Sequence, residues 1–450
     1  TALRSCIPLL QRFLIPNALT AGVLLFPFYN WIAPLINHGT GGVEHLTYHL
    51  LNIAIISVAL RADSRRNARA ITGSMVIILS QITIQGLIGF LLTFVLIWTV
   101  LPELFPSFGI LTAIGFSLGP GQAFAIGSSW EELGFAGAGS IGLTFGALGF
   151  LIACVGGVVL INVGIRQGWI ERPAEYSRRS GILPAGVPGP AGARLRTESE
   201  TIDSLSLWLA IVFGVYLVSY GVIVGVTHLL SLIGPTGERL AANLWGIAFI
   251  FGLLAAIVVR AIAKRFGIDH VLDSGGLTRI AGGAVDFMIV AGLSAIAVGV
   301  IAKYWLIFIL FTLIVGFSTV LSLFWITSRL FNDYPFERLL MFYGSLTGTI
   351  TTGIALVRMV DPELRTPATA DYCYASGLTF FLAIPLIMIM NLPAATADSG
   401  TTAGYWVTAA VLLTYGLVLL LVFRFLASSR NFAKSDIAFL NNKRKTDTSL

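Results

Sequence analysis

Residues 109–130 read GILTAIGFSLGPGQAFAIGSSW, an apolar segment that is interrupted at its centre by Leu118-Gly119-Pro120-Gly121-Gln122. Glycine and proline in a helix interior cost about 1 and 3 kcal/mol relative to alanine, so one continuous helix is disfavoured here. Irregular backbone at membrane depth persists only where protein buries it or water reaches it. We therefore expect a re-entrant hairpin, which dips into a membrane and returns to the side from which it came.

A second segment, residues 342–360, reads FYGSLTGTITTGIALVRMV and is broken in the same way by Gly, Ser and Thr. If both segments re-enter, all but two of the 28 Lys and Arg residues fall on one side of the membrane, the exceptions being Arg239 and Lys303. Because basic loops stay inside, that side is cytoplasmic. A full span at either segment would abolish this bias, so the charges favour two re-entrant hairpins.

The composition supports a membrane setting. Of 450 residues, 56% are hydrophobic and 11% are charged, whereas soluble domains carry about 25% charged residues. The net charge of +6 follows membrane orientation and does not indicate nucleic-acid binding. The three cysteines lie far apart with no CxxC spacing, so the sequence supports neither a disulfide framework nor a zinc site. The chain has no Gly-Lys dipeptide and therefore no Walker A loop, which argues against ATP-driven transport.

Ten apolar runs have about the length that a membrane helix needs, and they predict an all-α polytopic membrane protein. They are 13–35, 46–61, 71–100, 138–164, 205–230, 243–262, 280–299, 304–328, 370–391 and 404–426.

The order of runs and hairpins suggests two inverted-topology repeats, a mark of secondary transporters. In order, the predicted parts are repeat 1–165 with hairpin 109–130, a cytoplasmic Pro/Gly-rich linker 166–203, repeat 204–392 with hairpin 342–360, an extra span 393–427 and a basic cytoplasmic tail 428–450. The run 205–230 has no counterpart in the first repeat. We therefore expect a further span upstream of Thr1.

The two breaks carry the candidate site. Hydroxyls and freed carbonyls at a helix break coordinate Na+, and the positive N-termini of half-helices receive a carboxylate. The predicted substrate-binding residues are Ser117, Gly119, Gly121, Gln122, Ser345, Thr347, Thr349, Thr351, Thr352 and Arg358. The predicted cation-binding residues are Ser117, Gly119, Thr347, Gly348 and Asp286. The alternative is two kinked helices that merely pack against their neighbours.

Two of these residues allow a second interpretation. Asp286 is an intramembrane acid about two turns from the cytoplasmic end of its run, where an ion pair is an equal alternative to an ion site. Arg358 either attracts an anion or extends to the membrane interface. Gln81 and Gln85 share a helix face and either line the path or, as we favour, hydrogen-bond to another helix. Gly142, Gly146, Gly149 and Ala153 form a small-residue stripe suited to close packing.

The chain resembles the bacterial sodium/glutamate symporters from Ile15 to about Pro385. The resemblance rests on Ile15-Pro16-Asn17-Ala18 with Gly22, the Ser117–Gln122 break, Gly134-Phe135, Thr144-Phe145-Gly146 and the Gly/Thr-rich second hairpin. It implies a Na+-coupled symporter, a homodimer, and a transport domain that carries both hairpins and slides in an elevator-like motion. The first hairpin lacks the Gly-Gly-His-Gly-Thr type sequence that the family commonly has, so the implied substrate is glutamate or a related small organic anion.

The sequence thus predicts a symporter in the cytoplasmic membrane whose partners are a small anion, Na+, the bilayer and a second copy. We expect no cofactor and, since no catalytic constellation is present, no enzyme. Na+ is favoured because proton relays use Asp, Glu or His, which both hairpin cores lack. A H+-coupled carrier of another small organic solute, using Asp286, is the alternative, and a passive channel comes third.

Overall fold

The computed structural model describes residues 17–36, 41–61, 68–170, 203–232, 248–361, 366–396 and 403–427, with positions 7, 234, 241, 244 and 245. Every regular element within these residues is helical. Most of the expected linker 166–203 and the expected tail 428–450 lie outside them.

The helices follow the expected order. Those of the first half are α3 (Asn17–Pro27) with the short turns η1 (Phe28–Ile32) and η2 (Ala33–Ile36), α4 (Gly41–Ala59), α5 (Ala68–Thr99), α6 (Ile110–Ala113), η3 (Ile114–Leu118), α7 (Pro120–Glu131) and α8 (Ala138–Arg166). Those of the second half are α9 (Ser204–Ser231), α11 (Ala248–Arg265), η4 (Asp269–Val271), α12 (Ser274–Ala295), α13 (Val298–Leu330), α14 (Pro335–Thr347), α15 (Ile350–Val360), α16 (Ala368–Thr396) and α17 (Ala403–Leu426).

Helices occupy all ten apolar runs, and 7 of them are long and apolar enough to cross a membrane. An eighth is α16, if its two parts, bent by 58°, count as one span. The others carry polar residues: α4 contains Glu44, His45 and His49, and the last turns of α11 contain Arg260 and Lys264. The chain is therefore a polytopic α-helical membrane protein.

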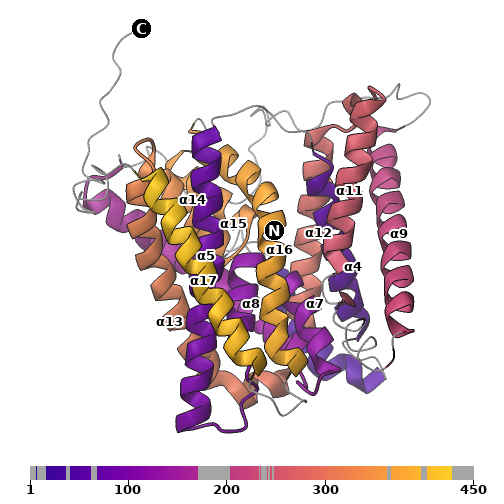
Figure 1. The fold of residues 1–450 in the computed structure, drawn as a ribbon, viewed down its shortest axis with the longest axis vertical. Coiled ribbons are helices and arrows are strands. Elements are labelled where there is room, and N and C mark those ends of the chain that lie inside the picture. The colour runs from indigo at the N-terminus through magenta and orange to yellow at the C-terminus, as the bar shows by residue number, and fades with distance from the viewer. Residues whose placement is uncertain are drawn as a thin grey trace.

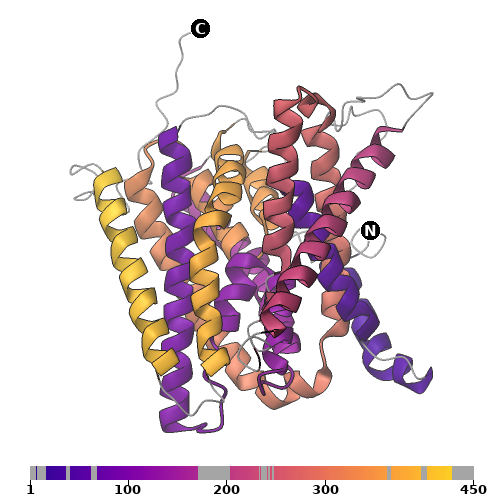
Figure 2. The same ribbon diagram turned by 45° about the vertical axis from the view of Figure 1, so that its right-hand side comes forward.

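The described helices form two groups that stand side by side in both views (Figures 1 and 2). The hairpin bundle comprises α5, α6, η3, α7, α8 and α13 to α17. The flanking bundle comprises α3, α4, α9, α11 and α12. Helices α7 and α8 of the hairpin bundle pack against α4 and α12 of the flanking bundle, so the first broken segment lies at the junction.

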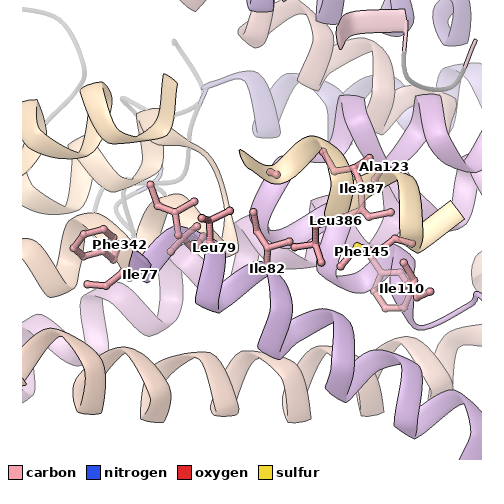
Figure 3. Close-up of a cluster of buried hydrophobic side chains, with 14 of the residues drawn as sticks. Ile77, Leu79, Ile82, Ile110, Ala123, Phe145, Phe342, Leu386 and Ile387 are labelled. Atoms are coloured by element: carbon pink, nitrogen blue, oxygen red, sulfur yellow. The ribbon is translucent and has the colours of Figure 1, made fainter. Parts of the chain in front are cut away.

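The core of the hairpin bundle is assembled from helices distant in sequence. Figure 3 shows Ile77, Leu79 and Ile82 of α5 in one cluster with residues of α6, α7, α8, α14 and α16. Buried apolar side chains contribute about 25 cal/mol per Å² removed from water. In a bilayer that term is small between helices, so close contact at small residues replaces it.

Two expectations from the sequence need correction. The second broken segment begins at Pro335 and not at residue 342, because the polar residues Glu337 and Arg338, which suggest a loop in the sequence, are buried in α14. Helix α12 begins at Ser274, so Asp286 lies roughly three turns into the helix at 3.6 residues per turn, deeper than expected.

Candidate functional site

The first break lies at Gly119. Its φ of +103° is a conformation that glycine adopts readily and other residues rarely adopt. The turn η3 ends at Leu118, and α7 starts at Pro120 with no side-chain cap on its first turn. Proline suits a first helical position because its missing N–H has no intrahelical partner there. The sequence Gly119-Pro120 therefore ends one half-helix and starts the next.

The second break lies at Gly348 and Thr349, between α14 and α15. A Cβ atom on Gly344 of α14 would lie 2.7 Å from the Cα atom of Gly353 in α15, so the two arms touch. Thr349 has extended backbone and its side chain does not cap α15. The segment is therefore a tight helical hairpin.

Helix α8 holds both breaks through its small-residue stripe. A Cβ atom on Gly146 would lie 2.6 Å from Cβ of Pro120, at the tip of the first hairpin. A Cβ atom on Gly149 would clash with the carbonyl oxygen of Thr347, at the tip of the second. These glycines are about 4.5 Å apart along the helix axis. The two tips therefore meet at one level near the middle of α8, and the expected packing role of the stripe is confirmed.

Gln85 joins the two tips from α5. Its Nε2 donates to the hydroxyl of Thr319 at 2.9 Å and to the carbonyl of Leu346 at 3.0 Å. Its Oε1 accepts a hydrogen bond from the hydroxyl of Ser117 at 2.5 Å. Gln81, one turn earlier, bonds to Ser322 of α13 at 2.9 Å. The expectation that both glutamines bond between helices is confirmed, and Gln85 also links the hairpins.

A cavity of about 420 Å³ lies between the two bundles, and both hairpin tips line it. The hairpin bundle contributes α5, the two tips and α16, and the flanking bundle contributes α4, α11 and α12. Such volumes fall in the range of about 300–1,000 Å³ that is usual for small-molecule sites.

The structure gathers six of the predicted site residues at this cavity. They are Ser117, Gly119, Gln122, Ser345, Gly348 and Thr349. Thr347 and Thr352 are buried beside them: the Thr347 hydroxyl donates to the carbonyl of Tyr343 at 2.6 Å, and the Thr352 hydroxyl lies 3.4 Å from that of Thr349. Gly121 packs against Met288 and Leu51. The side chain of Thr351 is not among those that the structure describes.

The two predicted charged residues lie elsewhere. Arg358 is exposed on α15, and Asp286 is exposed on α12. Neither is among the described residues that line the cavity. The predicted roles of Asp286 and Arg358 therefore remain predictions, since neither residue is among those that line the cavity with the tips.

Several lining residues were not predicted. Tyr372, Ser376 and Thr379 of α16 line the cavity and are four and three residues apart, which places them on one helix face. That spacing is visible in the sequence and could have identified this polar face. Arg61, just after α4, and Arg260 of α11 also line the cavity, and no local motif singles them out from the other basic residues.

Two buried hydroxyls at the cavity lack well-formed hydrogen bonds, those of Ser345 and Thr379. The Tyr372 hydroxyl neighbours Ser345. A buried polar group without a partner costs about 1–3 kcal/mol. The first turns of α7 and α15 also have no side-chain cap at the tips. The arrangement can therefore bind a polar or negatively charged group.

Comparison with protein-family models, curated proteins and solved structures finds no match to this chain. Within the described helices, no cluster of His, Cys, Asp or Glu side chains could hold a metal ion. What the chain binds must therefore be argued from the cavity.

Proposed function

We propose that this chain is a secondary active transporter for a small organic anion, coupled to Na+. The single observation that carries the proposal is the cavity at which two broken helices meet, near the middle of α8. Broken helices that meet near the bilayer midplane, with half-helix N-termini and unwound carbonyls, are typical binding sites of such transporters. Glutamate, which the resemblance implies, is the first solute to test.

The helix packing supports an inverted repeat. If the halves are related by a two-fold axis in the membrane plane, each contact has a counterpart in the other half. The contact of α3 with α12 corresponds to the contact of α11 with α4. The contact of α6 with α5 corresponds to that of α14 with α13, and the contact of α16 with α5 corresponds to that of α8 with α13. Helices α5 and α13 run antiparallel against each other, with Gln81 at Ser322 and Gln85 at Thr319.

The contact between the bundles supports an elevator-like motion. Buried apolar side chains meet there: Phe124, Leu143 and Phe150 of the hairpin bundle contact Ala18, Leu19, Ile289 and Leu293 of the flanking bundle. Apolar contacts are non-directional, so such a surface resists sliding less than a hydrogen-bonded one. In this proposal the hairpin bundle moves and carries the solute past the flanking bundle.

Na+ is proposed to bind at the C-terminal ends of η3 and α14, where carbonyl groups run out of helical partners. Ser117 and Thr347, at these ends, add hydroxyl groups. Proton coupling through Asp286 is the alternative, although its exposed position on α12 places it outside the cavity. A passive channel remains the third candidate.

The proposal includes a homodimer in the cytoplasmic membrane, with the linker and the C-terminal tail on the cytoplasmic side. Light scattering of the detergent-solubilised chain, corrected for bound detergent, measures the oligomeric state. If the chain is found to be a monomer, the proposed dimer is wrong, but the proposed transport site is unaffected.

Uptake by proteoliposomes tests the function. Labelled glutamate and other organic anions are presented to the reconstituted chain with an inward Na+ gradient, with an inward H+ gradient, or with neither. We expect accumulation above the external concentration only with the Na+ gradient. Accumulation driven by the H+ gradient alone would show that H+, and not Na+, is the coupling ion. Flux that only equilibrates the solute across the membrane would indicate a channel.

A Gln122→Ala variant, altered at the tip of the first hairpin, should lose uptake. A Glu132→Gln variant, at an exposed residue just after α7, should retain it. Equal uptake by both variants would contradict the placement of the site at the hairpin tips.

A further inference from the structure

We infer that the structure is the state of the carrier in which the cavity is reached from one end of the molecule, and that a seam between the two bundles seals it from the other end. The inference rests on the proposed transport function and names the access state of that same site. It follows from where the lining residues lie along their helices and from the contacts that join the bundles beyond the tips.

The cavity runs from the hairpin tips to the end of the molecule that we call the tail end. At this end α17 finishes and α5 begins, and Arg69 of α5 donates to the carbonyl of Leu426 in α17 at 3.3 Å. The residues of α4 that line the cavity all belong to its second half, from Leu51 onward. Arg61, beyond the last residue of α4, and Arg260, near the end of α11, also line the cavity and are partly exposed. The cavity therefore reaches the tail end.

Beyond the tips, a first layer of contacts joins the bundles. Gly121, in the first turn of α7, packs against Met288 of α12 and Leu51 of α4. A Cβ atom on Gly121 would clash with Sδ of Met288 and lie 3.1 Å from Cδ1 of Leu51. Met288 and Leu51 are both buried. Side chains of the flanking bundle therefore fill the space against the first hairpin tip.

A second layer lies one helical turn further from the tail end. A Cβ atom on Gly292 of α12 would lie 2.8 Å from Cδ2 of Leu143 in α8 and 3.6 Å from Cγ2 of Thr47 in α4. Gly292 follows Met288 by four residues, and Thr47 precedes Leu51 by four, so the layers are about 6 Å apart. Since α4 runs toward the tail end, the layer at Thr47 is the farther one. The seam comprises Thr47, Leu51, Gly121, Leu143, Met288 and Gly292.

The seam is built from parts that can separate. Gly121 and Leu143 belong to the hairpin bundle, whereas Met288 and Gly292 belong to the flanking bundle. Methionine is flexible and adapts to irregular space, and glycine lets helices approach closely in a membrane. If the hairpin bundle slides, both layers open together, because α7 and α8 move as one body. The same motion that carries the solute would therefore break the seal.

Thiol labelling tests the access side without knowledge of the solute. In a chain without native cysteines, Ser376→Cys places one thiol on a residue that lines the cavity. Arg265→Cys, exposed at the end of α11, and Glu132→Cys, exposed after α7, identify the two faces of sealed membrane vesicles. Without Na+ or added solute, a membrane-impermeant maleimide should react with the Ser376→Cys variant at least about tenfold faster from the face that labels Arg265→Cys, because a minor state is populated at about 10% or less.

Two substitutions at the seam and a control link this preference to the seal. Gly292→Leu leaves no room for Leu143 in the second layer, so it should raise the labelling rate from the opposite face. Gly282→Leu, in the same helix with open space around it, should leave both rates unchanged. If Gly292→Leu does not elute as a single peak in gel filtration, Met288→Ala, which removes most of the first layer, provides the same test. Unchanged rates in a folded seam variant would overturn the seal.

The outcomes separate this inference from the proposed function. Labelling at equal rates from both faces, faster labelling from the face that labels Glu132→Cys, or labelling from neither face would overturn the inference. Gradient-driven uptake in any of these cases would leave the transporter standing. One-sided labelling that the seam variants abolish, without gradient-driven uptake of any solute, would support the sealed state and overturn the transporter.

Discussion

At the scale of single residues, one amide connects three elements. Gln85 bonds to Ser117 at the first tip, to the Leu346 carbonyl at the second tip and to Thr319 of α13. A buried network of this kind is rigid when all of its members are satisfied. Gln85 therefore fixes the distance between the two tips across the cavity.

Replacing Gln85 tests whether the bridge between the two tips matters, and Gln81, one turn earlier on the same helix, serves as the control. Gln85→Ala should destabilise the protein by about 1–3 kcal/mol, because it leaves buried groups at both tips without a partner. Gln81→Ala, which removes only a contact with Ser322, should cost about 0.6 kcal/mol, the average for such bonds in membranes. Unfolding in detergent measures stability, and proteoliposome uptake measures activity. Equal losses of uptake in the two variants would show that bridging the tips is unimportant.

Gly119 offers a backbone test. Gly119→Ala introduces a side chain at a φ of +103° and a ψ of 169°, a region that only glycine adopts readily, and should cost about 1–3 kcal/mol. Its Cβ would meet only ordinary contacts, Gln122 Oε1 at 3.4 Å and Thr349 Cγ2 at 4.0 Å, so conformation and not crowding causes the loss. Gly283→Ala, in α12 with open space around it, is the control and should stabilise by about 0.5–1 kcal/mol. The melting temperatures of the two variants should therefore move in opposite directions.

At the scale of elements, α16 ties both hairpins into one body. Arg338 of α14 is 1% exposed and pairs with Asp371 of α16 at 2.9 Å, while its guanidinium also lies over the ring of Phe331. Trp130 of α7 donates to Asn391, further along α16, at 2.7 Å. The hairpins are therefore anchored at two levels of one helix.

The anchor of the second hairpin can be tested by a double-mutant cycle. Arg338→Met should destabilise by about 3–5 kcal/mol, because Asp371 remains as a buried, unpaired charge. Arg338→Met combined with Asp371→Leu should recover much of this loss. Asp333→Asn removes the partner that is 53% exposed and should cost less than about 1 kcal/mol. Additive losses in the double variant would show that the pair is not coupled.

At the scale of the whole molecule, the cavity exists only because two bundles meet. The hairpin bundle supplies the tips, and the flanking bundle supplies Arg61, Arg260 and the apolar face of α4 and α11. In the proposed transporter, the solute site and the moving surface are therefore linked, since any sliding at this interface would change the cavity.

Cross-linking tests the motion. In a chain without native cysteines, Gly292→Cys with Leu143→Cys connects the bundles, since a Cβ atom on Gly292 would lie 2.8 Å from Leu143 Cδ2. A short thiol cross-linker should stop uptake, and reduction should restore it. Gly252→Cys with Ile56→Cys is the matched pair within the flanking bundle, with a separation of 3.1 Å from Cβ to Cγ1, and should leave uptake unchanged. Full uptake by the first pair when cross-linked would exclude relative motion of the bundles.

The sequence by itself determined the local structure. Long apolar runs predicted the helices, because a lipid-exposed backbone must satisfy its own hydrogen bonds, and Gly119-Pro120 and Thr347-Gly348-Thr349 marked the two breaks. It also identified the glycine stripe and the glutamines correctly as packing and bonding groups, since small size and a buried amide restrict a residue to few roles.

Only the tertiary structure decided what the breaks face. The polar face of α16, the buried pair Arg338–Asp371, and the approach of Arg61 and Arg260 to the cavity depend on contacts between helices far apart in the chain. Periodicity reports which face of a helix is apolar, not which helix lies opposite. That choice is made by the fit of α8 between the two tips and of one bundle against the other.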